Sequence, residues 1–123
     1  MHIRFQATVT KGSGRGKTIG FPTINVNLED APANLRTGIY ACRVTLNGTV
    51  YPGAMHLGPR PVFNDTPSCE VHVIDAEITD VPKTLTIEVI EHIRNVRDFP
   101  DAAALTAQLE RDIDLIRGML SDS

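Results

Sequence analysis

The hydrophobic period of this chain changes once, near Asp101, and this change limits the folds that the chain can adopt. Before Asp101, short segments alternate apolar and polar residues and are separated by turns rich in Gly, Pro, Asn and Asp, which is typical of β-strands. Short strands followed by one amphipathic helix predict a mainly β fold, an antiparallel β-barrel of about six strands with the helix packed outside it. The helix is expected over about 101–120, with Asp101 as its N-cap. Its apolar stripe consists of Leu105, Leu109, Ile113, Ile116 and Leu120.

Strand signals divide the first part of the chain. They cover residues 3–10, 23–28, 38–58, 69–78 and 84–94. The third segment is predicted to be a hairpin, because Asn47-Gly48 favours a type I′ turn. In the second segment, Val26 and Leu28 are expected to point to the same face.

Composition excludes several classes of protein. The chain has 123 residues and a formal net charge of −3, which predicts a single domain over 1–123 and argues against a general nucleic-acid-binding surface. There is no apolar run of membrane-spanning length and no signal-peptide core, so a cytoplasmic protein is expected, and the absence of a spare apolar stripe favours a monomer. Cys42 and Cys69 have neither CxxC spacing nor clustered histidines, so they are predicted to be buried thiols.

The segment KGSGRGKT, residues 11–18, resembles a phosphate-binding P-loop at first sight. The P-loop pattern requires a glycine at position 11, where this chain has Lys11, and a helix afterwards, where it has Gly20 and Pro22. A Gly-rich basic loop can still cover phosphates, because its N–H groups and cations approach an anion without obstruction. The loop 11–20 is therefore either a phosphate-covering flap or a flexible hairpin connection.

Thr23 and Asn25 follow this loop directly and lie two residues apart. On a strand, this spacing projects the hydroxyl and the amide oxygen from one face. Two hard, neutral oxygen ligands suit Mg²⁺ that is carried in by nucleotide phosphates. The alternative is that both are polar outward residues of an edge strand.

Glu70, in the segment CEVHVID, is expected on the strand face opposite Cys69 and Val71. A carboxylate at the head of a half-buried strand could act as a general base toward a hydroxyl, or it could be a solvated strand residue. His72 lies on the same face, where it could serve acid–base chemistry or a structural role. The remaining histidines have no ligand spacing with it, so a zinc site is not expected.

Arg94 and Arg97 end the last strand and enter the loop before the helix, so they could face an anion or another ligand at the barrel mouth. Phe99 follows them and could cover an aromatic ligand or staple the helix start to the core.

Five sequence blocks occur in order between about residue 7 and residue 117: GSGRGKTIGFPTIN, GIYACRV, LGPRPVF, CEVHVID and IRNVRDFPDAAALTAQLERDI. Together they resemble the ATP-dependent riboflavin kinase family, which includes the kinase module of bacterial bifunctional FAD synthetases. The resemblance implies a six-stranded antiparallel Greek-key barrel with a C-terminal helix. It also implies transfer of the γ-phosphoryl group of ATP to the 5′-hydroxyl of riboflavin, which gives FMN and ADP. Mg²⁺ would accompany ATP, and no tightly bound prosthetic group, nucleic acid or membrane partner is expected.

The resemblance also assigns roles to residues. The family's Pro-Thr-x-Asn motif matches Pro22-Thr23-Ile24-Asn25, so Thr23 and Asn25 would hold Mg²⁺. The family's catalytic glutamate matches Glu70, which would accept the ribityl hydroxyl proton. The family's Gly-rich flap matches this chain's loop, with Arg15 and Lys17 as phosphate partners. The implied ATP-binding set is Gly12, Gly14, Arg15, Gly16, Lys17, Gly20, Pro22, Thr23 and Asn25.

The family's arginine in the loop before the helix matches Arg94, and Arg94, Arg97 and Phe99 form the expected flavin-binding set. The chain departs from the family pattern at 56–62, 80–85 and 95–97, around the expected nucleotide and flavin walls. These departures leave open a catalytically inactive flavin- or nucleotide-binding barrel, and a plain interaction barrel is a third hypothesis. Since the chain begins at the first barrel strand, either a stand-alone kinase or an excised domain is expected.

Overall fold

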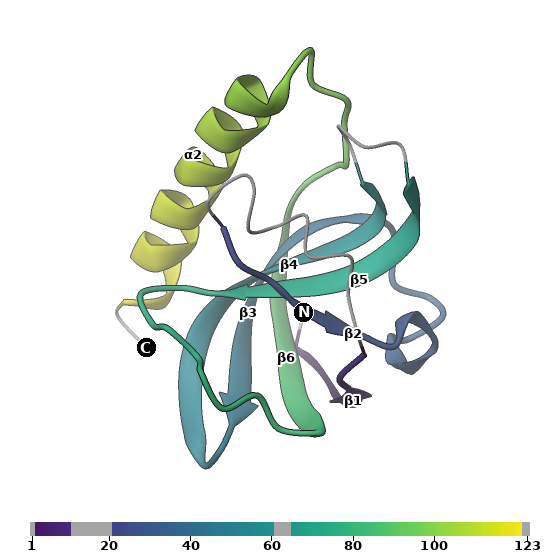
Figure 1. Ribbon diagram of the computed structural model, residues 1–123, viewed down its shortest axis with the longest axis vertical. Coiled ribbons are helices and arrows are strands. Elements are labelled where there is room, and N and C mark those ends of the chain that lie inside the picture. The colour runs from purple at the N-terminus through teal and green to yellow at the C-terminus, as the bar shows by residue number, and fades with distance from the viewer. Residues whose placement is uncertain (1, 11–20, 61–64, 122–123) are drawn as a thin grey trace.

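A computed structural model describes residues 2–10, 21–60 and 65–121. Figure 1 shows a strongly curved sheet with one long helix lying along its outer side. In chain order the elements are β1 (Ile3–Thr8), β2 (Ile24–Val26), the short 3₁₀ helix η1 (Leu28–Asp30), β3 (Gly38–Leu46), β4 (Thr49–Arg60), β5 (Asp65–Val73), β6 (Thr84–Arg94) and α2 (Ala102–Leu120). No helix in the described part of the chain is long and apolar enough to cross a membrane.

The six strands form one antiparallel sheet in the order β1-β6-β3-β4-β5-β2. Strands β3, β4 and β5 are consecutive neighbours, and β6 returns beside β3, which is the Greek-key arrangement. The sheet edges meet at an antiparallel bridge between Val9 and Val26. Backbone hydrogen bonds of 2.8 Å from Thr10 N to Asn25 O and from Asn27 N to Thr8 O reinforce it. The predicted mainly β Greek-key fold with a C-terminal helix is confirmed.

Alternation along the strands separates two apolar clusters. Inside the barrel lie inward-facing residues of every strand, among them Val26, Tyr40, Cys42, Val44, Met55, Cys69, Val71, Ile87 and Val89. A second cluster lies between the outer face of the sheet and α2, where Ile113 and Ile116 of the helix pack with Ala41 and Ile74. The helix therefore covers one part of the outer surface of the barrel and leaves the rest of that surface for polar groups.

Cys42 and Cys69 are free, buried thiols, as predicted. Burial, with a smaller contribution from the neighbouring Glu70 charge, raises the pKa of Cys69 to about 12. Burial raises the pKa of Cys42 as well. Both thiols are therefore protonated at neutral pH and pack as small apolar groups.

The helix is anchored to the barrel near its C-terminal end by Arg117. Its Nε donates to Asp75 Oδ2 at 2.8 Å and its Nη2 to Asp75 Oδ1 at 2.7 Å, while Nη1 donates to Asp114 at 2.7 Å. The hydrogen bonds from Arg117 hold the pKa of Asp75 below its usual value. Because all three side chains are exposed, this contact orients the helix more than it stabilises the fold.

Local sequence signals explain most element boundaries. Asp101 caps α2 by accepting a 2.8 Å hydrogen bond from Ala104 N, as predicted. Asn47 and Gly48 have φ of 47° and 79°, as a type I′ turn requires. The prediction that Leu28 shares a strand face with Val26 was wrong, because the strand ends at Val26 and Leu28 lies in η1 with 39% exposure. The cause is the Asn27 side chain, which accepts a hydrogen bond from Glu29 N and turns the chain out of the sheet.

Neighbouring helix residues provide a test of the helix–barrel contact. Ile116 is fully buried and Leu115 is 52% exposed. We expect Ile116→Ala to lower the free energy of unfolding by about 2–5 kcal/mol, because it opens a cavity under the helix. Leu115→Ala, the matched control, should change it by less than about 0.5 kcal/mol. Urea denaturation measures both, and equal losses would contradict this packing.

Candidate functional site

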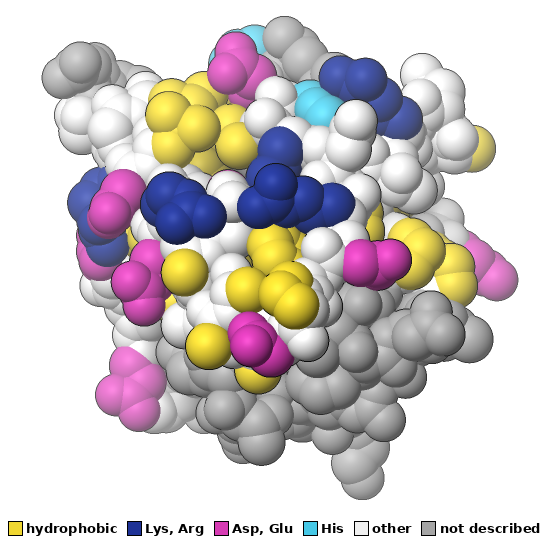
Figure 2. All heavy atoms as spheres, turned by 90° about the horizontal axis from the view of Figure 1, so that it is seen from above, with side chains coloured by type: hydrophobic (Ala, Val, Ile, Leu, Met, Phe, Trp, Pro, Cys, Tyr) yellow, Lys and Arg dark blue, Asp and Glu magenta, His cyan; other side chains and the backbone are white. Residues whose placement is uncertain are grey.

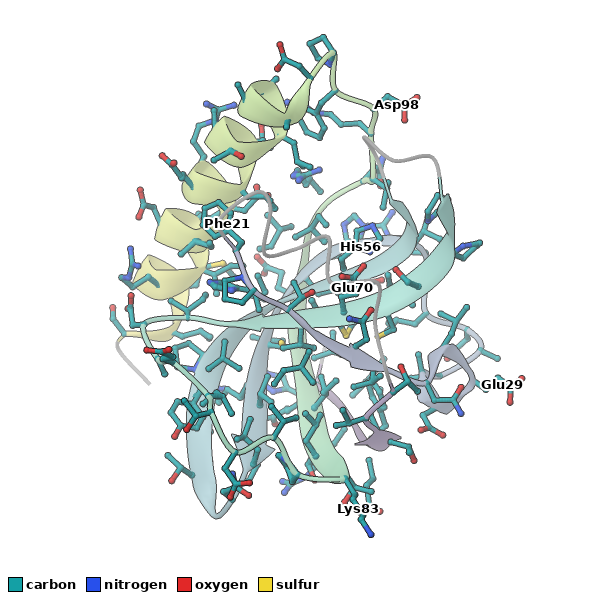
Figure 3. All side chains as sticks on the ribbon, viewed as in Figure 1. Phe21, Glu29, His56, Glu70, Lys83 and Asp98 are labelled. Carbon is teal, nitrogen blue, oxygen red and sulfur yellow. The ribbon has the colours of Figure 1, made fainter. Side chains whose placement is uncertain are left out.

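A row of paired residues crosses the outer face of the barrel at Glu70. On one side Glu70 of β5 pairs with Asn25 of β2, and on the other side it pairs with His56 of β4. Its chain neighbours Cys69 and Val71 belong to the barrel interior, so Glu70 projects outward, and residues directly opposite it share that face. Figure 3 shows Glu70 and His56 close together near the middle of the molecule.

The Glu70 carboxyl group is held by two hydroxyl groups. Thr23 Oγ1 donates to Oε1 at 2.8 Å, and Ser68 Oγ donates to Oε2 at 2.8 Å. Glu70 is only 9% exposed, and a buried carboxyl group needs such partners because burial removes water from it. The two bonds fix the orientation of the carboxyl plane and leave further lone pairs on both oxygens.

The segment that delivers Thr23 is positioned by β5. His72 Nδ1 lies 2.9 Å from the Pro22 carbonyl oxygen, and the rings of Phe21 and His72 meet edge to face at 5.5 Å. Phe21 also packs against the cluster beneath α2, beside which it appears in Figure 3. His72 was expected to serve either acid–base chemistry or a structural role, and its contacts with Pro22 and Phe21 fit the structural role.

Thr23, Asn25 and Glu70, the predicted metal ligands and base, therefore come together. The Thr23 hydroxyl donates a hydrogen bond to Glu70, so the lone pairs of the Thr23 oxygen remain available to a cation. Among residues 2–10, 21–60 and 65–121, no group of three or more His, Cys, Asp and Glu side chains could hold a metal ion. Neutral oxygen donors without an acidic cage fit Mg²⁺ that brings phosphate ligands with it.

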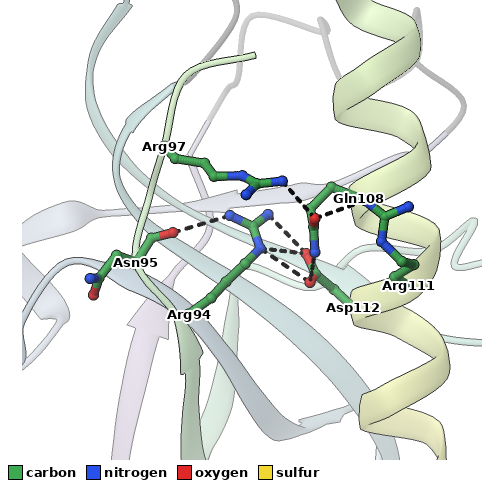
Figure 4. A network of polar contacts seen from close by, with 6 residues as sticks. All are labelled: Arg94, Asn95, Arg97, Gln108, Arg111 and Asp112. Carbon is green, nitrogen blue, oxygen red and sulfur yellow. Dashed lines mark hydrogen bonds and ion pairs between the residues drawn. The ribbon is translucent and has the colours of Figure 1, made fainter.

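Arg94, predicted to contact the flavin, forms an ion pair with the buried Asp112 of α2. Arg94 Nε lies 3.1 Å from Oδ1 and 3.0 Å from Oδ2, and Nη2 lies 2.8 Å from Oδ2. Nη1 donates to the Asn95 carbonyl at 3.1 Å. The Asp112 side chain is 3% exposed and that of Arg94 is 16% exposed, so a mostly buried ion pair joins the end of β6 to the helix (Figure 4).

The other two members of the predicted flavin-binding set lie next to this ion pair. Arg97 Nη2 donates to Gln108 Oε1 at 2.8 Å, and Gln108 Nε2 donates to Asp112 Oδ1 at 2.9 Å, which completes the network in Figure 4. The guanidinium carbon of Arg97 lies 4.8 Å from the centre of the Phe99 ring, and that of Arg94 lies 5.7 Å from it. Phe99 thus supports the two arginines through cation–π contacts. Figure 2 shows Lys and Arg side chains gathered on the face seen from above in Figure 1.

Part of the predicted ATP-binding set lies outside the described residues. These residues are Gly12, Gly14, Arg15, Gly16, Lys17 and Gly20. The described members, Pro22, Thr23 and Asn25, lie immediately after that loop and next to Glu70.

Sequence reasoning missed four polar residues of this region, namely Ser68, His56, Asp112 and Gln108. Ser68 had a usable signal, because it lies two residues before Glu70 on the same strand face. Asp112 also had one, since it falls within the buried stripe of α2, beside Ile113 and Ile116. A carboxylate in such a stripe predicts a cationic partner. The pairing of His56 with Glu70 depends on strand register, which local pattern does not give.

A family model described as "Flavokinase: Riboflavin kinase" matches residues 1–120. The chain belongs to the riboflavin kinase family. The bifunctional riboflavin kinase/FMN adenylyltransferase of Bacillus subtilis is 38% identical over 108 residues, which are 85% of this chain and 34% of that protein. That of Haemophilus influenzae is 32% identical over 120 residues, 96% of this chain and 39% of that protein. The chain thus spans little more than a third of these relatives.

Solved structures share the fold of this riboflavin kinase family domain. The crystal structure of a riboflavin kinase from Trypanosoma brucei superposes with a TM-score of 0.66 at 22% identity, over 96% of this chain and 79% of that one. A Streptococcus pneumoniae structure titled as a macrolide-efflux protein superposes with a TM-score of 0.81 at 26% identity, over 94% of this chain and 38% of that one. The barrel with one helix is therefore a recurrent structure.

The Arg94–Asp112 pair yields a prediction about stability. Asp112→Leu should lower the free energy of unfolding by roughly 3 kcal/mol, because it leaves the Arg94 guanidinium mostly buried without its carboxylate. The double variant Arg94→Met/Asp112→Leu should recover most of this loss, since neither charge remains. Urea denaturation of both single variants and the double variant measures the coupling. Additive losses would contradict a direct ion pair.

Proposed function

We propose that this domain is a riboflavin kinase, which transfers the γ-phosphoryl group of ATP to the 5′-hydroxyl of riboflavin and releases FMN and ADP. The observation that carries the proposal is the 2.8 Å hydrogen bond between Thr23 and Glu70, with Asn25 paired opposite Glu70, in a chain of this family. This arrangement places a carboxylate directly beside two oxygen donors suited to a nucleotide-bound cation.

Glu70 is the proposed general base. It accepts the proton of the riboflavin 5′-hydroxyl as that oxygen bonds to the γ-phosphorus, and the bond from the γ-phosphorus to the β–γ bridging oxygen breaks to release ADP. The hydroxyls of Thr23 and Ser68 fix the carboxylate before substrate arrives, so no reorientation is needed during the reaction. Its low exposure strengthens its interaction with the incoming hydroxyl.

Thr23 and Asn25 are the proposed protein ligands of Mg²⁺. The ion supplies charge neutralisation for the nucleotide phosphates when it is bound. Thr23 presents its lone pairs outward because its proton is engaged by Glu70. Asn25 is fixed in the β2–β5 ladder, and its backbone carbonyl oxygen also accepts a hydrogen bond from Thr10 N at 2.8 Å. Asn25 would therefore bind from strand β2, and Thr23 from the segment that directly precedes it.

The loop 11–20 is the proposed phosphate-binding segment, with Arg15 and Lys17 as the proposed cationic partners. The proposed flavin side is the network at the start of α2. Arg97 and Phe99 are the proposed contacts there, and Arg94 contributes by holding their loop against Asp112. We also propose that the protein acts as a monomer in the cytoplasm and has no nucleic-acid partner.

Chromatography of the flavins formed from riboflavin, ATP and Mg²⁺ tests the proposed reaction. We expect FMN from the unmodified chain. Glu70→Gln should reduce kcat by about 10²–10⁴-fold while riboflavin binding persists, because the amide cannot accept the proton. Glu88→Gln, on β6 and more exposed, is the matched control and should keep full activity. A folded chain that binds riboflavin and forms no FMN would support the inactive-barrel alternative instead.

Substitutions of Thr23 test the proposed cation site. Thr23→Val keeps the shape and removes the oxygen, so KM for Mg·ATP should rise about 10- to 100-fold. Thr23→Ser, the matched control, keeps the hydroxyl and should remain within about threefold of the unmodified chain. EDTA should abolish FMN formation and excess Mg²⁺ should restore it. An unchanged KM in Thr23→Val would exclude Thr23 as a ligand.

A further inference from the structure

His72 has no role in the reaction proposed above, yet it touches the segment that carries Thr23. It lies two residues after Glu70 on β5, on the same outward face, and it is half-buried. Its Nδ1 is 2.9 Å from the Pro22 carbonyl oxygen. A carbonyl oxygen can only accept a hydrogen bond, so Nδ1 must carry the proton of this bond.

A hydrogen bond to the Pro22 carbonyl restrains the backbone that leads directly into Thr23. Proline has no N–H, so the carbonyl is the only backbone hydrogen-bonding group of this residue. Strand β2 begins at Ile24, so residues 21–23 precede its ladder. The carbonyl also belongs to the peptide plane that joins Pro22 to Thr23, and fixing this plane fixes where the Thr23 side chain starts.

A second contact of the same imidazole ring also restrains the segment. The Phe21 ring meets His72 edge to face, with an interplanar angle of 90° and a centroid distance of 5.5 Å. Phe21 itself packs against the apolar cluster under α2. One imidazole thus contacts both residues that precede Thr23, and Thr23 in turn reaches Glu70 at 2.8 Å.

We propose that His72 is a positioning residue, which holds Phe21 and Pro22 so that the Thr23 hydroxyl points its proton at Glu70 and its lone pairs at the nucleotide-bound cation. This inference rests on the proposed kinase function. The Nδ1–H group exists in the neutral Nδ1 tautomer and in the imidazolium ion, so the contact does not require a charged ring. His72 acts through Thr23 and takes no proton from substrate.

Two amide substitutions at this position form a matched pair. Asn places its amide nitrogen near the position of Nδ1, while Gln extends its amide farther, toward the position of Nε2. We expect His72→Asn to keep KM for Mg·ATP within about threefold and His72→Gln to raise it about tenfold, a loss comparable to that of a ligand-orienting residue. KM for riboflavin should not change in either variant. Equal losses in both variants, or equal rises of both KM values, would overturn the proposal.

A measurement without turnover separates this inference from the kinase proposal. Long-range ¹H–¹⁵N spectra of the unmodified chain distinguish the His72 tautomers, and we expect a proton on Nδ1. A bare Nδ1 would overturn the proposal, because two acceptors cannot bond. If the unmodified chain formed no FMN, the kinase proposal would fail, while the tautomer and the Mg·ADP affinities of the Asn and Gln variants, measured by calorimetry, would still decide the role of His72. Urea denaturation of both variants shows whether the fold is retained.

Discussion

The site depends on one buried carboxyl group, that of Glu70, on the outer face of the barrel. A carboxylate with 9% exposure is costly unless hydrogen bonds replace its water. The hydroxyls of Thr23 and Ser68 supply these bonds. Because Thr23 lies just before β2 and 47 residues from Glu70, the bond that satisfies Glu70 also holds the segment that begins at Phe21 against β5. Satisfying one buried group therefore assembles the proposed base and the proposed metal ligands.

Strand register makes this assembly possible. Glu70 alternates with Cys69 and Val71, which fill the barrel core. A slip of one residue in β5 would bring the carboxylate into the core and expose two apolar side chains, so the apolar pattern specifies the register strongly. The same register pairs Glu70 with Asn25 and His56. The packing of the barrel core thus determines which polar residues on the outer face, Asn25 and His56, lie opposite Glu70.

The sequence predicted features that depend on period and local chemistry. The outward face of Glu70, the turn at Asn47-Gly48 and the cap at Asp101 are all local, and the structure has each of them. Contacts between distant segments were not predictable in this way. The Arg94–Asp112 pair joins residues 18 positions apart, and the His72–Pro22 contact joins residues 50 apart. The resemblance to a family implied roles for single residues, but hydrophobic periodicity does not predict which side chains form hydrogen bonds across the fold.

The helix links these observations to function. A helix that only covered the barrel would need its apolar stripe alone, yet α2 also places the buried Asp112 against Arg94. Replacing such a pair with apolar residues is often neutral for stability, so stability alone does not account for it. The pair orients the loop that carries the exposed Arg97 and the half-buried Phe99, which lie on the proposed flavin side. Helix α2 therefore orients this loop, as His72 is proposed to orient Thr23. The proposed flavin side and the proposed cation side of the site are thus both oriented by residues that need not touch substrate.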